Sequence, residues 1–100
     1  MRKSFFLISI LLFNNILFSQ ESETVRIATY NVLNYPDNYS TRNPNLKKVI
    51  DEIDPDILVV QEMTSLFGVY TFLNEVLTPS FIAGPFIDGP DTDNAIFYKD

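Results

Sequence analysis

The stretch DPDILVVQEMTS, residues 54–65, decides the fold of this chain. Its four consecutive apolar residues, 57–60, are typical of a strand that is buried on both faces. Gln61 and Glu62 follow at once, and a carboxylate is costly to bury without a partner. We therefore expect Glu62 to leave the core at the edge of a sheet, and the elements on either side of this strand indicate what it meets there.

An earlier strand and a helix precede this stretch. TVRIATYNVLN, residues 24–34, is rich in β-branched and aromatic residues and alternates in the manner of a strand. Residues 35–45 are dense in Pro, Asn, Asp and Ser and predict a loop. A helix is then expected with Asn43 as its cap and Pro44 at its first position, ending at 54–56. Its apolar stripe consists of Leu46, Val49, Ile50 and Ile53.

A second helix and two short strands are expected after residue 63. Thr64 or Ser65 is the candidate cap of the helix, and its apolar spacing is set by Leu66, Tyr70, Leu73 and Leu77. Residues 81–83 and 95–98 predict strands joined by a turn-rich connection. Four aromatic side chains are expected in the core: Phe67, Tyr70, Phe72 and Phe81.

Strand, helix and strand in this order form a βαβ unit of ordinary size. If its strands are parallel neighbours, Asn31 and Glu62 converge at the edge where α/β sheets bind ligands. Amide and carboxylate oxygens are hard ligands that suit Mg²⁺ or Mn²⁺. Solvated polar residues at strand ends are common, however, and the geometry by itself favours that plainer interpretation by about two to one.

The sequence motifs of the predicted strands give a second argument for a metal site. RIATYNVLN (26–34), DPDILVVQEM (54–63) and DNAIFYK (93–99) together resemble the opening of the endonuclease/exonuclease/phosphatase superfamily, the group with a DNase I-like fold. The resemblance implies that Asn31 and Glu62 belong to a divalent-metal site. It also implies an α/β (α+β) fold in which this chain forms the N-terminal half of a four-layer αββα sandwich.

The function implied by the resemblance is hydrolysis of phosphate esters with Mg²⁺ or Mn²⁺ as cofactor. The family also uses a His-Asp unit, an Asp-x-Asn motif and an Asp-His motif, and this sequence contains no histidine. We therefore expect residues 20–100 alone to be inactive, and the full-length protein to be a metal-dependent phosphodiesterase or phosphatase. A nuclease is favoured, while lipid and sugar-phosphate substrates stay open. The alternative is a secreted, non-catalytic binding or adhesion module that retains the fold.

The first residues predict export. Arg2 and Lys3, followed by the apolar run 5–13 and a polar stretch from Gln20, are typical of a signal peptide spanning residues 1–19. The remaining residues, 20–100, are expected to form part of one domain without a membrane span, in a secreted or periplasmic, bacterial protein. Cleavage leaves five basic residues against thirteen acidic ones, a net charge of −8. Such a surface repels nucleic-acid backbones, so a nucleic-acid substrate requires either a metal ion for local neutralisation or basic residues from sequence outside these 100 residues.

Three other polar groups are given plainer roles. DGPDTDN, residues 88–94, holds several acidic residues but lacks the Gly and Glu of an EF-hand loop, so we expect a polar turn. Asn94 could reach the cleft and is left unassigned. Arg42, Lys47 and Lys48 could contact phosphate, but we expect them on a solvated loop and helix face.

Overall fold

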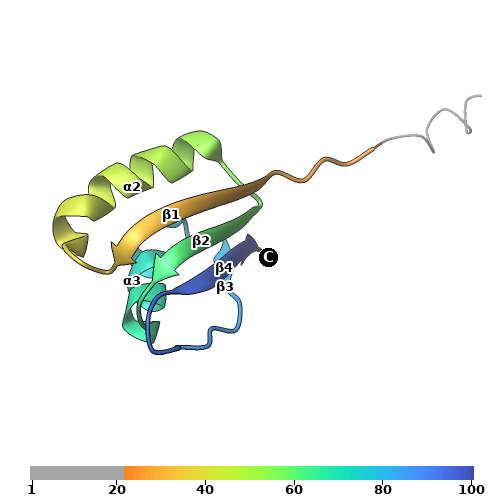
Figure 1. The fold of residues 1–100 in the computed structure, drawn as a ribbon. Helices are drawn as coiled ribbons and strands as arrows, with labels where there is room; N and C mark the ends of the chain where they lie inside the picture. Colours follow the sequence, from red (N-terminus) through yellow and green to blue (C-terminus); the bar gives the residue numbers. More distant parts are fainter. Residues whose placement is uncertain (1–21) are drawn as a thin grey trace, which may run out of the picture.

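The computed structural model describes residues 22–100, so the expected signal peptide at 1–19 lies outside the described residues. The order of elements is strand, helix, strand, helix, strand, strand (Figure 1). Their bounds are β1 Ile27–Tyr35, α2 Tyr39–Ile53, β2 Ile57–Met63, α3 Leu66–Glu75, β3 Phe81–Ala83 and β4 Asp93–Lys99.

One mixed four-stranded sheet, in the order β1-β2-β4-β3, organises this part of the chain. β1 and β2 are parallel neighbours, as the βαβ pattern predicts, while β4 is antiparallel to both β2 and β3. The described residues therefore form a small α+β domain with a mixed sheet and two helices. The α/β class is confirmed at this level.

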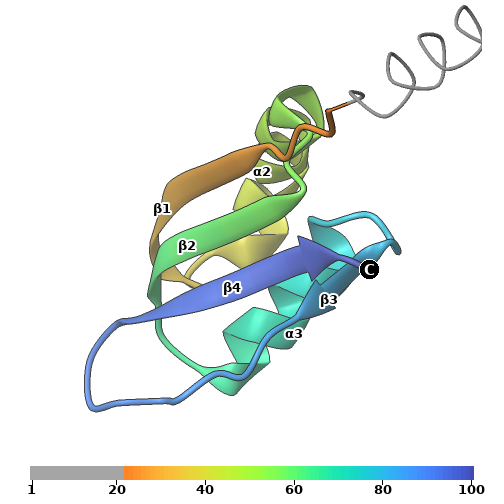
Figure 2. The ribbon, with the colours of Figure 1, turned by 90° about the vertical axis from the view of Figure 1, so that its right-hand side faces the viewer.

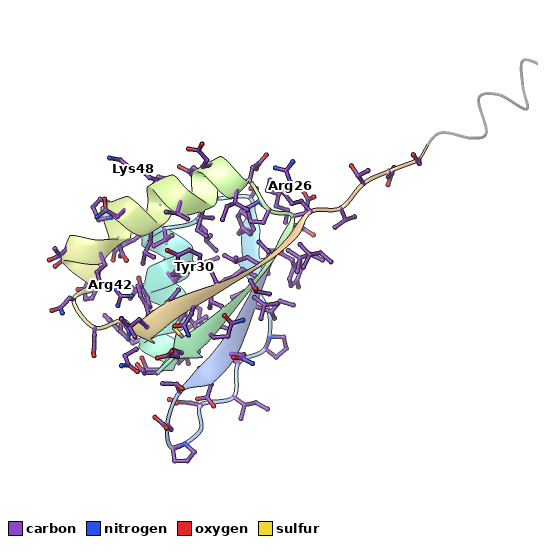
Figure 3. All side chains as sticks on the ribbon, turned by 45° about the horizontal axis from the view of Figure 1, so that its top comes forward. Arg26, Tyr30, Arg42 and Lys48 are labelled. Atoms are coloured by element: carbon purple, nitrogen blue, oxygen red, sulfur yellow. The ribbon has the colours of Figure 1, made fainter. Side chains whose placement is uncertain are left out.

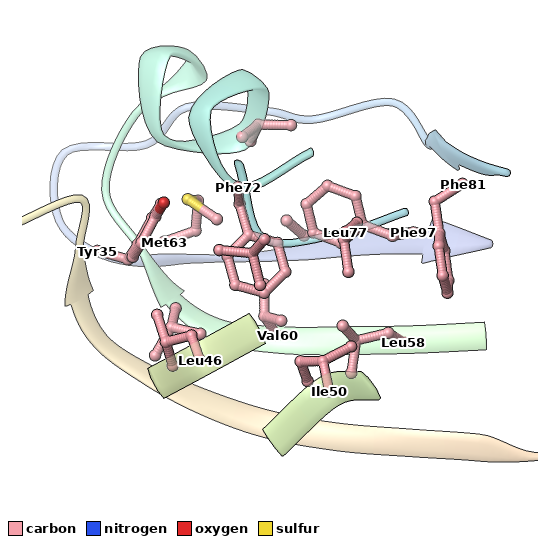
Figure 4. Packing of buried hydrophobic residues seen from close by; sticks show 14 residues of the cluster. Tyr35, Leu46, Ile50, Leu58, Val60, Met63, Phe72, Leu77, Phe81 and Phe97 are labelled. Atoms are coloured by element: carbon pink, nitrogen blue, oxygen red, sulfur yellow. The ribbon is translucent and has the colours of Figure 1, made fainter. Parts of the chain in front are cut away.

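The core lies between the sheet and the helices. Inward-facing residues of β1, β2 and β4 meet α2 and α3, and Phe72 of α3 is fully buried at the centre (Figure 4). Its ring centroid is 5.4 Å from that of Tyr35 and 5.2 Å from that of Phe97. These aromatic contacts join β1, α3 and β4, so a substitution of Phe72 by alanine would remove about 3–5 kcal/mol of stability.

The opposite face of the sheet is open. Figure 2 shows α2 and α3 together behind the sheet, with no element of residues 22–100 in front of it. The register places Ile27, Ile57, Tyr98 and Ile82 in one row across all four strands. Of these, Ile27 is 65% exposed, and Tyr98 and Ile82 are also exposed. β2 is therefore not buried equally on both faces, because Ile57 and Val59 are only half-buried.

The start of α2 differs from the prediction. The helix begins at Tyr39, because Asn38 adopts a left-handed conformation and its carbonyl accepts the N–H groups of both Thr41 and Arg42. The expected loop shortens to three residues, and Asn43 is not the cap but a buried residue of the helix. Pro44 is tolerated in its second turn at the loss of one backbone hydrogen bond.

The end of α2 and its stripe agree with the sequence more closely. The helix ends at Ile53, and Asp54 follows in a left-handed conformation with its N–H bonded to the carbonyl of Ile50. Leu46 and Ile50 are buried, whereas Val49 is exposed. The strand predicted from Thr24 begins at Ile27 instead.

The cap of α3 is Ser65, whose hydroxyl accepts the N–H of Gly68 at 3.1 Å. The predicted apolar stripe of this segment is right in part: Leu77 is buried and Leu73 packs against the core, but Leu66 and Tyr70 are exposed. Val69 and Phe72 supply the rest of the buried face of the helix. Phe67 is 60% exposed and is not a core residue. An apolar helix offers several stripes of similar hydrophobicity, and packing against β4 selects one. Within residues 22–100, neither helix is both long and apolar enough to cross a membrane.

Candidate functional site

The parallel pairing of β1 with β2 creates the candidate site. Both strands end on the same edge of the sheet, where their arrowheads lie side by side in Figure 1. Asn31 is opposite Gln61 in the register, which places Glu62 one residue further along the neighbouring strand. The geometric expectation from the βαβ unit therefore agrees with the structure.

Both strands break their alternation immediately after this point. Val60 and Met63 are each fully buried although two residues separate them, and the pairing of β2 with β4 shifts between them. Regular alternation would have turned Glu62 into the core and Met63 out of it. The bulge instead keeps the Glu62 carboxylate partly exposed, which is how bulges re-aim side chains near functional sites.

This re-aiming uses unfavourable backbone conformations. Glu62 has φ 63°, and Leu33 and Asn34 in β1 have φ 45° and 52°. A residue other than glycine in the left-handed region costs on the order of 1–3 kcal/mol, and such residues cluster at functional sites. Three of them lie within a few residues of the Asn31–Glu62 edge, so the fold stores strain at this place.

The two candidate side chains are in direct contact. Nδ2 of Asn31 donates a hydrogen bond to Oε2 of Glu62 at 2.5 Å. Oδ1 of Asn31 accepts the backbone N–H of Leu33 at 2.8 Å. Because a backbone N–H can only donate, this second bond fixes the amide with its nitrogen toward Glu62. Asn31 thus orients the carboxylate from one side.

The ends of the strands are tied together beside this pair. Thr64 donates both its backbone N–H and its hydroxyl to the carbonyl of Tyr35, each at 2.9 Å. A hollow of about 310 Å³ opens next to Asn31, between β1 and α2. Its lining consists of Tyr30, Asn31, Leu33, Arg42, Asn45, Leu46 and Val49.

The donor set of the site consists of one carboxylate and one carboxamide. Among residues 22–100, no group of three or more acidic, histidine or cysteine side chains is placed to hold a metal ion. Asn31 is the one residue of this range that donates a hydrogen bond to the Glu62 side chain, and that bond goes to Oε2. The second carboxylate oxygen, Oε1, accepts no hydrogen bond from residues 22–100. The metal role of Glu62 and Asn31 stays a prediction.

Two of the three basic residues of α2, Arg42 and Lys47, have bonding partners in the structure. Arg42 is half-buried and bonds backbone carbonyls, so it does not lie on a solvated face. Lys47 forms a surface pair with Asp51 at 3.3 Å, and Lys48 is exposed (Figure 3). The sequence did not reveal the role of Arg42, because its partners are backbone atoms brought close by the fold.

β4 contributes residues to the same edge. Its first residue, Asp93, is opposite Met63 in the register, and Asn94 is exposed across from the bulge that contains Glu62. The Asp93 carboxylate accepts the N–H of Gly89 at 2.8 Å. This bond closes the 88–94 segment on itself, in agreement with the expected polar turn.

A second hollow, of about 360 Å³, lies at the other end of the sheet. The charged groups at this hollow bond to one another or to the backbone. The Arg26 guanidinium donates to the carbonyl of Ile53, and the backbone N–H of Arg26 donates to the Asp56 carboxylate. Asp54 is bonded to Lys99 at 2.9 Å, and this hydrogen bond together with the positive charge lowers the pKa of Asp54. The charged side chains at this end of the sheet are therefore bonded to one another or to the backbone, and we do not assign a ligand site to them.

Comparison with protein-family models, with curated proteins and with solved structures gives no match for this chain. The resemblance to the endonuclease/exonuclease/phosphatase superfamily therefore stays an expectation drawn from the sequence motifs at 26–34, 54–63 and 93–99.

Proposed function

We propose that the full-length protein is an exported, metal-dependent phosphoesterase of the endonuclease/exonuclease/phosphatase type, with a nuclease as the favoured activity. The observation that carries the proposal is the contact between Asn31 and Glu62 at the carboxyl edge of two parallel strands. The two motifs of the resemblance are 31 residues apart, and their key side chains meet. If the sequence motifs matched the family by chance, Asn31 and Glu62 would have no reason to lie in contact.

The residues fit Mg²⁺ or Mn²⁺. Mg²⁺ is usually held by one or two carboxylates and keeps waters and phosphate oxygens as its other ligands. Glu62 offers one carboxylate, and one of its two oxygens accepts no hydrogen bond within residues 22–100. A bound Mg²⁺ supplies charge neutralisation of a phosphoryl oxygen, which an acidic chain needs for an anionic substrate.

Each of the two residues has a separate task in this proposal. Glu62 binds the cation through its free oxygen. Asn31 orients the Glu62 carboxylate through Nδ2, and the backbone of Leu33 holds the amide in that orientation. The group that activates water comes from sequence beyond these 100 residues, so residues 20–100 on their own are inactive in the proposal.

The open sheet face supports the finer fold assignment. Its apolar row of Ile27, Ile57, Tyr98 and Ile82 has the character of the inner face of a two-sheet sandwich. We propose that a second sheet covers it in the full-length protein, which gives the four-layer αββα arrangement of DNase I-like proteins.

Hydrolysis of defined substrates tests the function. Full-length protein is assayed on duplex DNA, RNA and bis(p-nitrophenyl) phosphate, with Mg²⁺ and with excess chelator. We expect Mg²⁺-dependent cleavage of DNA that falls at least about a hundredfold in Glu62→Gln. Glu52→Gln, on the exposed face of α2, is the matched control and keeps full activity. Activity that survives both chelator and Glu62→Gln would contradict the proposal, and nucleic-acid binding without cleavage would indicate a binding module.

A further inference from the structure

Arg42 holds the end of β1 with both terminal nitrogens of its guanidinium group. Nη1 donates to the carbonyl of Leu33 at 3.0 Å and to that of Asp37 at 2.9 Å, and Nη2 donates to the carbonyl of Val32. The guanidinium also lies over the ring of Tyr35, 5.9 Å from its centroid. Figure 3 shows Arg42 between the start of α2 and the end of β1.

The carbonyls of Val32 and Leu33 lie where the pairing of β1 with β2 is interrupted, and the carbonyl of Asp37 lies beyond the end of β1. Pairing of β1 with β2 stops at Asn31 opposite Gln61 and resumes at Tyr35 opposite Met63. Between these points Leu33 and Asn34 adopt left-handed conformations, which turn the backbone away from the ladder. Backbone carbonyls that leave a ladder need other donors, and the fork of an arginine can serve several at once.

The same turn sets the orientation of Asn31. It aims the N–H of Leu33 at Oδ1 of Asn31, and that bond directs Nδ2 of Asn31 at Glu62. A continuous series of hydrogen bonds therefore runs from Arg42 through the backbone of Leu33 and the amide of Asn31 to the Glu62 carboxylate. Each bond in the series is 3.0 Å or shorter.

We propose that Arg42 is a positioning residue for the Asn31–Glu62 pair, which it holds in the geometry that receives the cation. The proposal rests on the proposed function, because it assigns Arg42 to the metal site defined there. Residues that orient a metal ligand through a second bond typically change metal affinity 10–100-fold when they are replaced.

Mn²⁺ affinity separates the positioning effect of Arg42 from the effect of its positive charge, because the two act in opposite directions. A positive group beside a cation site repels the cation, so loss of the charge alone strengthens Mn²⁺ binding. Loss of positioning weakens it. Arg42→Lys keeps the charge but replaces the planar fork with a single ammonium group, which cannot reproduce the same set of bonds.

The test measures Mn²⁺ binding to the full-length protein by calorimetry, together with amide hydrogen exchange at Leu33. Arg42→Lys and Arg42→Ala are compared with Lys48→Ala, which removes an exposed charge from the same helix. We expect both Arg42 variants to raise the Kd for Mn²⁺ about tenfold and to speed exchange at Leu33. Lys48→Ala leaves both quantities within about twofold of the wild type, and exchange at the buried Leu58 reports that the variants fold.

The outcomes separate the two proposals. Unchanged Mn²⁺ affinity in a folded Arg42→Lys protein, or tighter binding in Arg42→Ala, would overturn the role of Arg42 while leaving the metal site intact. Absence of Mn²⁺ binding in the wild type would contradict the proposed function itself, and the assignment of Arg42 would fall with it. If Arg42→Ala does not fold, the milder Arg42→Lys decides.

Discussion

The hydroxyl of Tyr35 is a polar group inside the core, and it is fully satisfied. Tyr35 is completely buried, and its hydroxyl donates to Oδ1 of Asn43 at 2.9 Å. Nδ2 of Asn43 donates in turn to Glu75 at 3.2 Å. Three side chains thus connect β1, α2 and α3. A buried network of this kind is stabilising only while every member keeps its partner.

Removal of the Tyr35 hydroxyl tests this network. Tyr35→Phe leaves Oδ1 of Asn43 without its donor, and we expect a loss of about 1–2 kcal/mol in unfolding free energy at pH 7, measured by urea denaturation. Tyr70→Phe, at an exposed position of α3, is the control and changes stability by less than about 0.5 kcal/mol. Equal effects of the two substitutions would show that the network contributes nothing.

Alkaline pH provides a second readout of the same residue. Burial raises the pKa of Tyr35 to about 12 from its ordinary 10.0, although the hydrogen bond with Asn43 acts to lower it. The folded state therefore holds the proton more tightly than the unfolded state. The contribution of the protonated Tyr35 to the unfolding free energy is fully present below pH 10 and declines as the pH rises toward 12. Tyr35→Phe abolishes this part of the decline in unfolding free energy with pH.

At the level of single residues, the sequence predicted the contact of Asn31 with Glu62 because strand order and side-chain type both pointed to it. Asn43 was misassigned, because asparagine is common at helix caps and local sequence does not show that Tyr35 and Glu75 converge on it. The contacts of Arg42 escaped prediction for a similar reason, since backbone carbonyls carry no sequence signal.

Among the elements, the bulge in β2 connects stability with function. Glu62 occupies the left-handed region that glycine adopts without penalty. Glycine would adopt this conformation without strain, so the chain keeps the Glu62 side chain at a cost in backbone energy. If a side chain holds its backbone in a strained conformation, replacing that residue with glycine is expected to raise the stability of the protein.

A pair of substitutions tests this element. We expect Glu62→Gly to be more stable than Glu62→Ala by about 1 kcal/mol, because only glycine relieves the left-handed strain. At Glu52, within α2, the order reverses and alanine is the more stable by about 1 kcal/mol. Urea denaturation of the four variants measures both differences. Alanine proving more stable at both positions would show that Glu62 is not strained.

The element boundaries were predictable only in part. β3, β4 and the end of α2 followed from apolar runs and turn residues. The start of α2 did not, because Asn38 begins the helix through its backbone conformation and makes no side-chain cap. The buried face of α3 was undecidable from an almost wholly apolar segment, since tertiary packing chose among its stripes.

On the scale of the whole molecule, the elements of residues 22–100 cover the sheet on one face only. Ile96, like Tyr98, faces away from the helices and is exposed in residues 22–100. If a second sheet covers this face in the full-length protein, Ile96→Asp buries an unpaired charge and lowers the unfolding free energy by more than about 2 kcal/mol. Ile87→Asp, in a loop where the side chain is 86% exposed, is the control. If Ile96→Asp and Ile87→Asp both change thermal stability only slightly and equally, no second sheet covers this face.

The central claim is that Glu62, oriented by Asn31, binds a divalent cation at the carboxyl edge of β1 and β2. Anomalous diffraction from crystals of the full-length protein soaked in Mn²⁺ tests it most directly. We predict an anomalous peak about 2.1 Å from a carboxylate oxygen of Glu62, and its loss in crystals of Glu62→Gln. A saturating soak that places Mn²⁺ elsewhere, with Glu62 still bonded only to Asn31, would contradict the account.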